Sequence, residues 1–134
     1  MITINDTFRK FLDEQEANLE PDVFLDYEDV MLLFEEFLEL SAEDNLSDMD
    51  RDLYTSRHKH DNASYCDMFG PEHLTLSGIK EFLEDYVVEA GGKKLTGTAA
   101  TVLDEFFKWA MGEGYIEEKA YEANTEVLNE YKKK

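Results

Sequence analysis

The sequence predicts an all-α protein, a compact bundle of five or six helices around a single hydrophobic core. Apolar residues recur every three or four positions along most of the chain, the spacing that gathers them on one side of an α-helix. Strand-like alternation is scarce, and proline, which breaks helices, occurs only at positions 21 and 71. A length of 134 residues with 43% hydrophobic residues suits one core. We therefore expect residues 1–134 to form a single helical domain.

Two helices are expected in the first part of the chain. The first runs from about residue 6 to residue 18, and Pro21 interrupts it. Its inward residues are Phe8, Phe11, Leu12 and Leu19. The second begins after Asp26, whose carboxylate can accept a hydrogen bond from an unpaired amide of the first turn. Its broad apolar stripe predicts the central helix of the core, with Val30, Met31, Leu33, Phe34, Phe37 and Leu38 inward.

The pattern weakens over residues 45–73, which mix charged residues, turn residues and isolated aromatics. Only the stretch around residues 47–57 has helical spacing. We expect residues 45–73 to be an irregular and mobile segment within the domain.

Regular spacing returns with a helix that Thr75 or Ser77 can cap. Gly91 and Gly92 end it, because glycine readily takes the left-handed conformation found just past a helix end. The expected inward residues are Ile79, Phe82, Leu83, Tyr86 and Val87.

Two further helices complete the predicted bundle. Thr96 or Thr98 can cap the first, which Gly112 or Gly114 ends. The last spans about residues 117–131 and precedes a lysine tail that suits the negative end of a helix dipole. The inward residues of the two helices are expected to be Val102, Leu103, Phe106, Phe107, Ala110, Met111, Ala120, Tyr121, Val127 and Leu128.

The formal net charge of −19 is unevenly distributed. Residues 1–50 contain 16 acidic and two basic residues, a net charge of −14. Such a field repels phosphate, so we expect no direct binding to nucleic acid or to anionic lipid. No apolar run approaches the length of a membrane span, and the single cysteine, Cys66, excludes an intramolecular disulfide. We therefore expect a protein of the reducing cytoplasm.

An acidic row on the second helix is the candidate partner-binding site. It consists of Glu28, Glu35, Glu36, Glu39 and Glu43. Like charges four residues apart destabilise a helix by roughly 0.2–0.5 kcal/mol per pair, so core packing must outweigh them. The row suits the docking of a basic protein, and the alternative is a charged helix side that faces only solvent.

Residues 79–118 carry a second pattern, in which Phe82 and Leu83 are followed by the threonines of 96–101, the aromatic run 106–109 and the Gly-Tyr-Ile turn at 114–117. This stretch resembles the helical core-binding (SAM-like) domain of tyrosine recombinases and phage integrases. The resemblance implies a helical module that clamps DNA beside a separate catalytic domain with a nucleophilic tyrosine. Tyr131 lacks the Arg and His motifs that precede such a nucleophile, so that role is not transferred to it.

The metal-capable side chains gather within 16 residues of the irregular segment: His58, His60, Asp61, Cys66 and His73. Zinc binds four such ligands tetrahedrally, but the spacing matches no standard zinc module, and polar surface residues are the alternative. Asp48, Asp50 and Asp52 imitate the start of a calcium loop, which fails at Leu53 and Lys59. No nucleotide-binding or nucleophile-elbow motif occurs, so no catalytic residue and no cofactor is assigned.

These observations favour a non-enzymatic, acidic interaction or regulatory protein that engages a basic partner protein. Two alternatives stay open. One is an integrase-like helical module or an acidic mimic of DNA, and the other is a small metal-binding protein that uses His58, His60, Cys66 and His73. The sequence also leaves a homodimer open.

Overall fold

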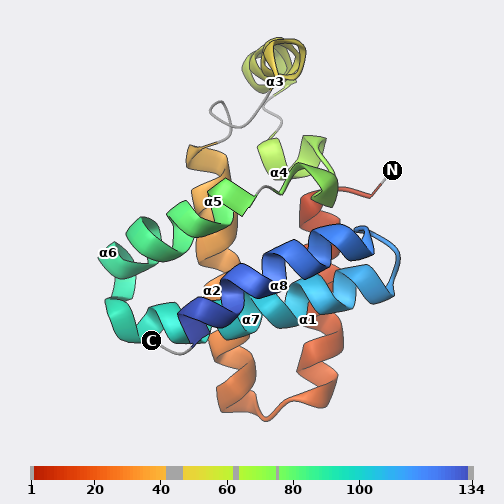
Figure 1. The fold of residues 1–134 in the computed structure, drawn as a ribbon. Helices are drawn as coiled ribbons and strands as arrows, with labels where there is room; N and C mark the ends of the chain where they lie inside the picture. Colours follow the sequence, from red (N-terminus) through yellow and green to blue (C-terminus); the bar gives the residue numbers. More distant parts are fainter. Residues whose placement is uncertain (1, 42–46, 62–63, 75, 133–134) are drawn as a thin grey trace.

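The all-α prediction is confirmed. The structure, a computed structural model, describes residues 2–41, 47–61, 64–74 and 76–132, in which every regular element is helical (Figure 1). The side chains of His60 and Asp61 also lie outside the described part. The elements are α1 (Ile4–Asn18), α2 (Pro21–Leu40), α3 (Asp48–Asp61), α4 (Tyr65–Met68), a 3-10 turn (Pro71–His73), α5 (Leu76–Glu81), a π-helical turn (Phe82–Tyr86), α6 (Val87–Gly91), α7 (Lys93–Gly112) and α8 (Glu118–Lys132).

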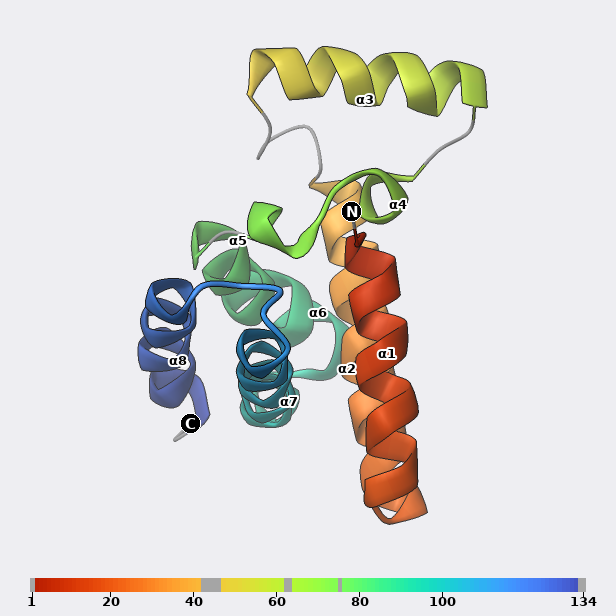
Figure 2. The same cartoon turned by 90° about the vertical axis from the view of Figure 1, so that its right-hand side faces the viewer.

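The longer helices of the body form two antiparallel pairs, and the elements from α3 to α6 lie between these pairs in the chain. α1 and α2 lie side by side, and α7 and α8 form the second pair, with α7 packed against α1 and α2 (Figure 2). α3 lies at one end of the molecule, beyond α4 (Figures 1 and 2). Tyr54 of α3 packs on the body: it is 7% exposed and lies edge-on against Tyr65 at a ring-centroid distance of 6.2 Å.

The core is rich in aromatic rings contributed by all the long helices of the body. Phe8 of α1 meets Phe106 of α7 edge-on at 5.1 Å, and Phe34 of α2 meets Phe82 at 4.9 Å. Aromatic pairs in such geometries add about 0.5–1.5 kcal/mol each beyond the burial of their area. The predicted stripe of α2 is inward as expected, with Leu33 half-buried.

α1 begins two residues before the predicted start, at a capping box. The Asp6 amide donates to Thr3 Oγ1 at 3.1 Å, and the Thr3 amide donates to Asp6 Oδ2 at 3.3 Å. These two bonds satisfy amides that a helix start leaves without partners. The same contacts with the Thr3 backbone and hydroxyl lower the pKa of Asp6.

The predicted start of α2 after Asp26 is wrong, because the helix begins at Pro21. Proline has no amide hydrogen and its backbone angle suits the first helical position, where that hydrogen would have no partner. The first helix does end before Pro21, as predicted, and Pro21 then opens α2. Asp26 lies inside the helix and is exposed.

Thr96 and Thr98 do not cap α7, which begins at Lys93 directly after Gly92. Gly92 has a φ of +80°, so the end of the preceding helix at Gly91 agrees with the prediction. Thr96 is instead buried, with its hydroxyl 3.5 Å from the Leu83 carbonyl oxygen. Ser77 lies inside α5, whereas Thr75 is outside the described residues.

The segment 45–73 is more regular than predicted. α3 extends to Asp61, and α4 buries Tyr65, Cys66 and Met68. The Ile4 amide donates to the Phe69 carbonyl oxygen at 2.8 Å, which joins the end of this segment to the start of α1. Residues 45, 46, 62 and 63 lie outside the described part.

A buried carboxylate fastens α8 to α7. Asp104 of α7 is 8% exposed, and its two oxygens accept hydrogen bonds from the Thr125 hydroxyl and the Lys132 ammonium, each at 2.5 Å. These directional hydrogen bonds supplement the apolar packing between α7 and α8, to which Leu103 and Leu128 contribute.

Candidate functional site

The candidate acidic row divides into exposed and structural members. Glu28 and Glu36 are exposed on the outside of α2, while Glu35 and Glu39 are half-buried. Glu43 lies outside the described residues. Their spacing along one helix predicted that all five glutamates share a side of that helix. It gave no information about the other helices that pack against that side.

Glu39 holds the start of α4. Its Oε1 accepts a hydrogen bond from the Tyr65 amide at 2.8 Å, and its Oε2 accepts one from the Cys66 amide at 2.9 Å. α4 is a single turn, and the side chain of the preceding Ser64 caps none of its amides, because its hydroxyl donates to Asp67 Oδ2 at 2.8 Å. Glu39 therefore supplies from a different helix the acceptor that a capping residue usually provides.

Glu35 and Glu36 lie in different environments on α2. Partial burial raises the pKa of Glu35, and the negative charges of Glu39, Asp67 and Glu36 raise it further. Glu36 Oε2 accepts a hydrogen bond from the Tyr86 hydroxyl at 3.3 Å, which connects α2 with the π-helical turn. Glu36 remains accessible to a partner.

A row of exposed leucines runs between these carboxylates. Leu25, Leu32 and Leu40 are 53%, 55% and 76% exposed. They are seven and eight residues apart, about two helical turns each, so they lie on one side of α2. We call Leu25, Glu28, Leu32, Glu36 and Leu40 together the α2 outer face.

Shallow hollows accompany the α2 outer face. One of about 350 Å³ is lined by Leu32, Glu35, Glu36, Glu39, Leu40 and Tyr86. Another, of about 390 Å³, is lined by Glu16, Leu19, Pro21, Phe24, Leu25 and Glu28. Both are lined by apolar side chains together with carboxylates. The exposed leucines were not predicted, because the spacing of the glutamates indicated a charged side of the helix.

The described candidate metal ligands, His58, Cys66 and His73, are not brought together. Among the described residues, no group of three or more His, Cys, Asp or Glu side chains is arranged to hold a metal ion. His58 is exposed and stacks on Tyr54 at 5.3 Å, whereas the His73 ring lies against Phe69 at 4.8 Å. Cys66 is fully buried. The side chains of His60 and Asp61 lie outside the described part, so that part of the prediction is not tested.

Cys66 lacks the surroundings of a reactive thiol. Burial raises its pKa, and the nearby Glu39 carboxylate raises it further. A reactive cysteine needs an accessible thiolate, which positive neighbours stabilise. Cys66 has the opposite environment and packs within the core.

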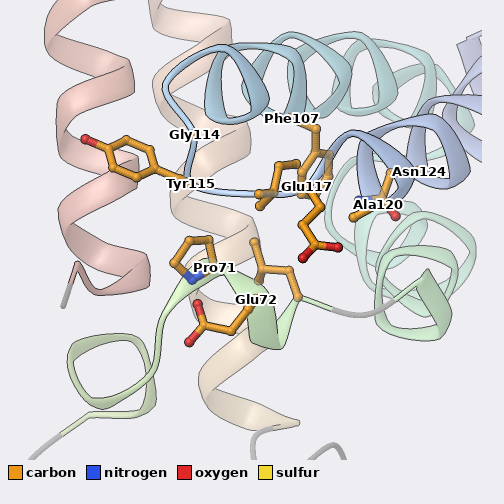
Figure 3. Close-up of a pocket in the computed structure, with 10 residues that line it drawn as sticks. Pro71, Glu72, Phe107, Gly114, Tyr115, Glu117, Ala120 and Asn124 are labelled. Atoms are coloured by element: carbon orange, nitrogen blue, oxygen red, sulfur yellow. The ribbon is translucent and has the colours of Figure 1, made fainter.

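A hollow of about 480 Å³ lies at the corner between α7 and α8, facing the 3-10 turn (Figure 3). It is lined by Pro71, Glu72, Leu74, Phe107, Gly114, Tyr115, Ile116, Glu117, Ala120 and Asn124. We call this hollow the corner cavity. Ala120, which we predicted to face inward, is exposed there, and Asn124 is buried instead.

The fold and these surfaces define a class, an all-α bundle with an acidic helix side interrupted by exposed leucines. Comparison with protein-family models, with curated proteins and with solved structures finds no match for this chain. The resemblance of residues 79–118 to the recombinase core-binding domain stays a prediction. Within the described ranges, no helix is both long and apolar enough to cross a membrane.

Proposed function

We propose that this protein binds a partner protein through the α2 outer face, and that the partner presents a basic amphipathic helix. The observation that carries the proposal is the alternation of exposed leucines with carboxylates along α2. Leu32 and Leu40 are each more than half exposed, and Glu36 lies between them in sequence. Helix-in-groove recognition uses apolar anchors about one or two turns apart, which is the arrangement of these leucines.

Charge complementarity supports a basic partner. α2 contains seven acidic residues and no lysine or arginine, and the first 50 residues have a net charge of −14. A negative surface of this kind accelerates encounters with positive proteins and opposes encounters with negative ones. The leucines add apolar area, which contributes to affinity without depending on salt.

The experiment uses two labelled synthetic peptides of the same composition. One arranges leucine and lysine as an amphipathic helix, and the other scrambles the same residues. We expect the amphipathic peptide to bind more tightly in fluorescence anisotropy and its affinity to fall with added salt. Equal affinity for both peptides would show that only net charge is recognised and would overturn the proposal.

Matched variants locate the binding surface. The double variant Glu28→Gln/Glu36→Gln removes two exposed carboxylates from α2, and Glu118→Gln/Glu122→Gln removes two from α8. The proposal requires the first pair to weaken peptide binding more than the second. Leu32→Ser/Leu40→Ser should weaken binding even in high salt, since these side chains act through apolar contact.

A further inference from the structure

The large apolar side chains that are exposed in the described part of the chain all lie on α2 and α3. On α3, Met49 is 81% exposed and Leu53 is 50% exposed. The two residues are four positions apart, so they lie on one side of the helix. Tyr54 lies on another side of α3 and packs on Tyr65, so the side that carries Met49 and Leu53 faces solvent.

The second half of α3 is basic. Residues 53–60 contain Arg57, Lys59 and two histidines, and no acidic residue. The aspartates of α3 lie in its first five residues and at its last position. Arg57 is exposed and follows Leu53 by four residues, so it lies about 6 Å further along the same side of the helix. This half of α3 therefore combines an exposed apolar residue with positive charge.

The end of the α2 outer face repeats this spacing with the opposite charge. Glu36 and Leu40 are both exposed and lie four residues apart, about 6 Å along the helix. When α2 and the α3 of another copy lie antiparallel, Leu53 of one copy can meet Leu40 of the other. Arg57 and Glu36 are then also opposite each other. This contact removes apolar side chains from water, and the opposite charges favour this direction of the two helices.

Both surfaces lie at the same end of the molecule. Glu39, the neighbour of Leu40, holds the start of α4, and Tyr54 of α3 packs on Tyr65 of α4. α3 lies beyond the end of α2 (Figures 1 and 2). Two copies can therefore make the contact in both directions, with the α3 of each on the α2 of the other, which closes a two-fold dimer.

We propose that a second copy of this chain is the partner of the α2 outer face, and that its α3 is the helix that docks there. The inference rests on the proposed function, because it uses the same side of α2 and identifies the basic amphipathic helix. The two net charges of −19 repel each other. At about 0.15 M salt, however, exposed charges more than about 8 Å apart are largely screened, whereas close pairs and apolar contacts remain.

Sedimentation velocity of the whole chain at about 0.15 M salt measures this association. We expect a reversible dimer with twice the mass of one chain. Leu53→Ser should weaken dimerisation about tenfold, since the side chain is lost from both contacts. Val23→Ser, which changes a similarly exposed residue of α2 outside the α2 outer face, should not. A protein that stays monomeric at about 0.5 mM, or equal effects of the two variants, would overturn the inference.

An exchange of charges tests the pairing of Arg57 with Glu36. Arg57→Glu and Glu36→Arg should each dimerise about tenfold more weakly than wild type, because each variant alone brings like charges together at both contacts. An equimolar mixture of the two variants should form a dimer with about the wild-type affinity, since both contacts then join opposite charges. No recovery in the mixture would mean that these residues do not face each other, and the inference would fail.

The amphipathic leucine–lysine peptide distinguishes this inference from the proposed function. The peptide should compete for the α2 outer face and dissociate the dimer. If the peptide binds a protein that stays monomeric, the inference fails and the proposed function stands. If the dimer persists when the peptide is saturating, the dimer uses another surface and the inference fails. If neither the peptide nor a second copy binds, both fail.

Discussion

The Glu39 carboxylate accepts a hydrogen bond from the Cys66 amide, with Oε2 2.9 Å from the amide nitrogen, although the two residues lie 27 positions apart in the sequence. The second oxygen accepts from the neighbouring Tyr65 amide. Through these bonds the end of α2 holds the first turn of α4, which contributes Tyr65 and Cys66 to the core. Glu39 therefore has a structural role that separates it from the exposed carboxylates of α2.

Replacing Glu39 should destabilise the fold. Glu39→Ala leaves two amides of buried residues without their acceptors, and we expect a loss of about 2 kcal/mol in the free energy of unfolding. Urea denaturation followed by circular dichroism measures this loss. Glu28→Ala, an exposed residue of the same helix, is the control and should change stability by less than about 0.5 kcal/mol. Equal stabilities of the two variants would show that the Glu39 bonds contribute nothing.

The thiol of Cys66 should be protected in the folded protein. It is fully buried and its pKa is raised by burial, so little thiolate is accessible. The chain has one cysteine, so a disulfide reagent reports on it alone. We expect the native protein to react about a hundredfold more slowly than the protein in urea, because reaction requires opening of the structure. Glu39→Ala should react faster than wild type, and rapid reaction of native wild-type protein would contradict the buried position.

Local spacing was sufficient to predict the core but not the contacts between helices. Helical periodicity alone predicts that Phe34 and Phe106 face the core, because it determines which side of a helix is apolar. The role of Glu39 depends on α4, an element brought close only by folding. Threonine is a common helix-capping residue, yet the Thr96 hydroxyl lies near the carbonyl oxygen of Leu83, which belongs to the π-helical turn. Sequence spacing contains no such information.

The candidate sites show the same limit. Glu28 and Glu36 were predicted as exposed carboxylates from the pattern of charge, and the structure places both at the surface. The exposed positions of Leu32 and Leu40 were not predicted. Leu25, Leu32 and Leu40 are seven and eight residues apart, so they are widely spaced among the charged residues on that side of α2. The burial of Asn124 was also missed, since a polar residue on a terminal helix is ordinarily exposed to solvent. Its burial depends on the packing of α8 against α7 and α5.

The raised pKa of Glu35 gives a pH dependence with a defined sign. A carboxyl whose pKa is higher in the folded than in the unfolded state opposes folding once it is ionised, so its penalty is present at neutral pH. The penalty disappears as pH falls below the unfolded value near 4.5. Glu35→Gln should therefore unfold at higher urea concentration than wild type at pH 7, and the difference should shrink towards pH 4. A difference that grows on acidification would contradict the assignment.

Asp104 should contribute more to stability than any exposed carboxylate, because it is buried and accepts from two partners on α8. Asp104→Ala leaves the Thr125 hydroxyl and the Lys132 ammonium without this acceptor, and we expect a loss of about 2 kcal/mol. Lys132→Met should cost less, since Thr125 still pairs with Asp104. The double variant should lose less than the sum of the two single losses, because both remove the same ion pair. Glu105→Ala, an exposed neighbour on α7, is the control. Additive losses in urea denaturation would mean that Asp104 and Lys132 act independently.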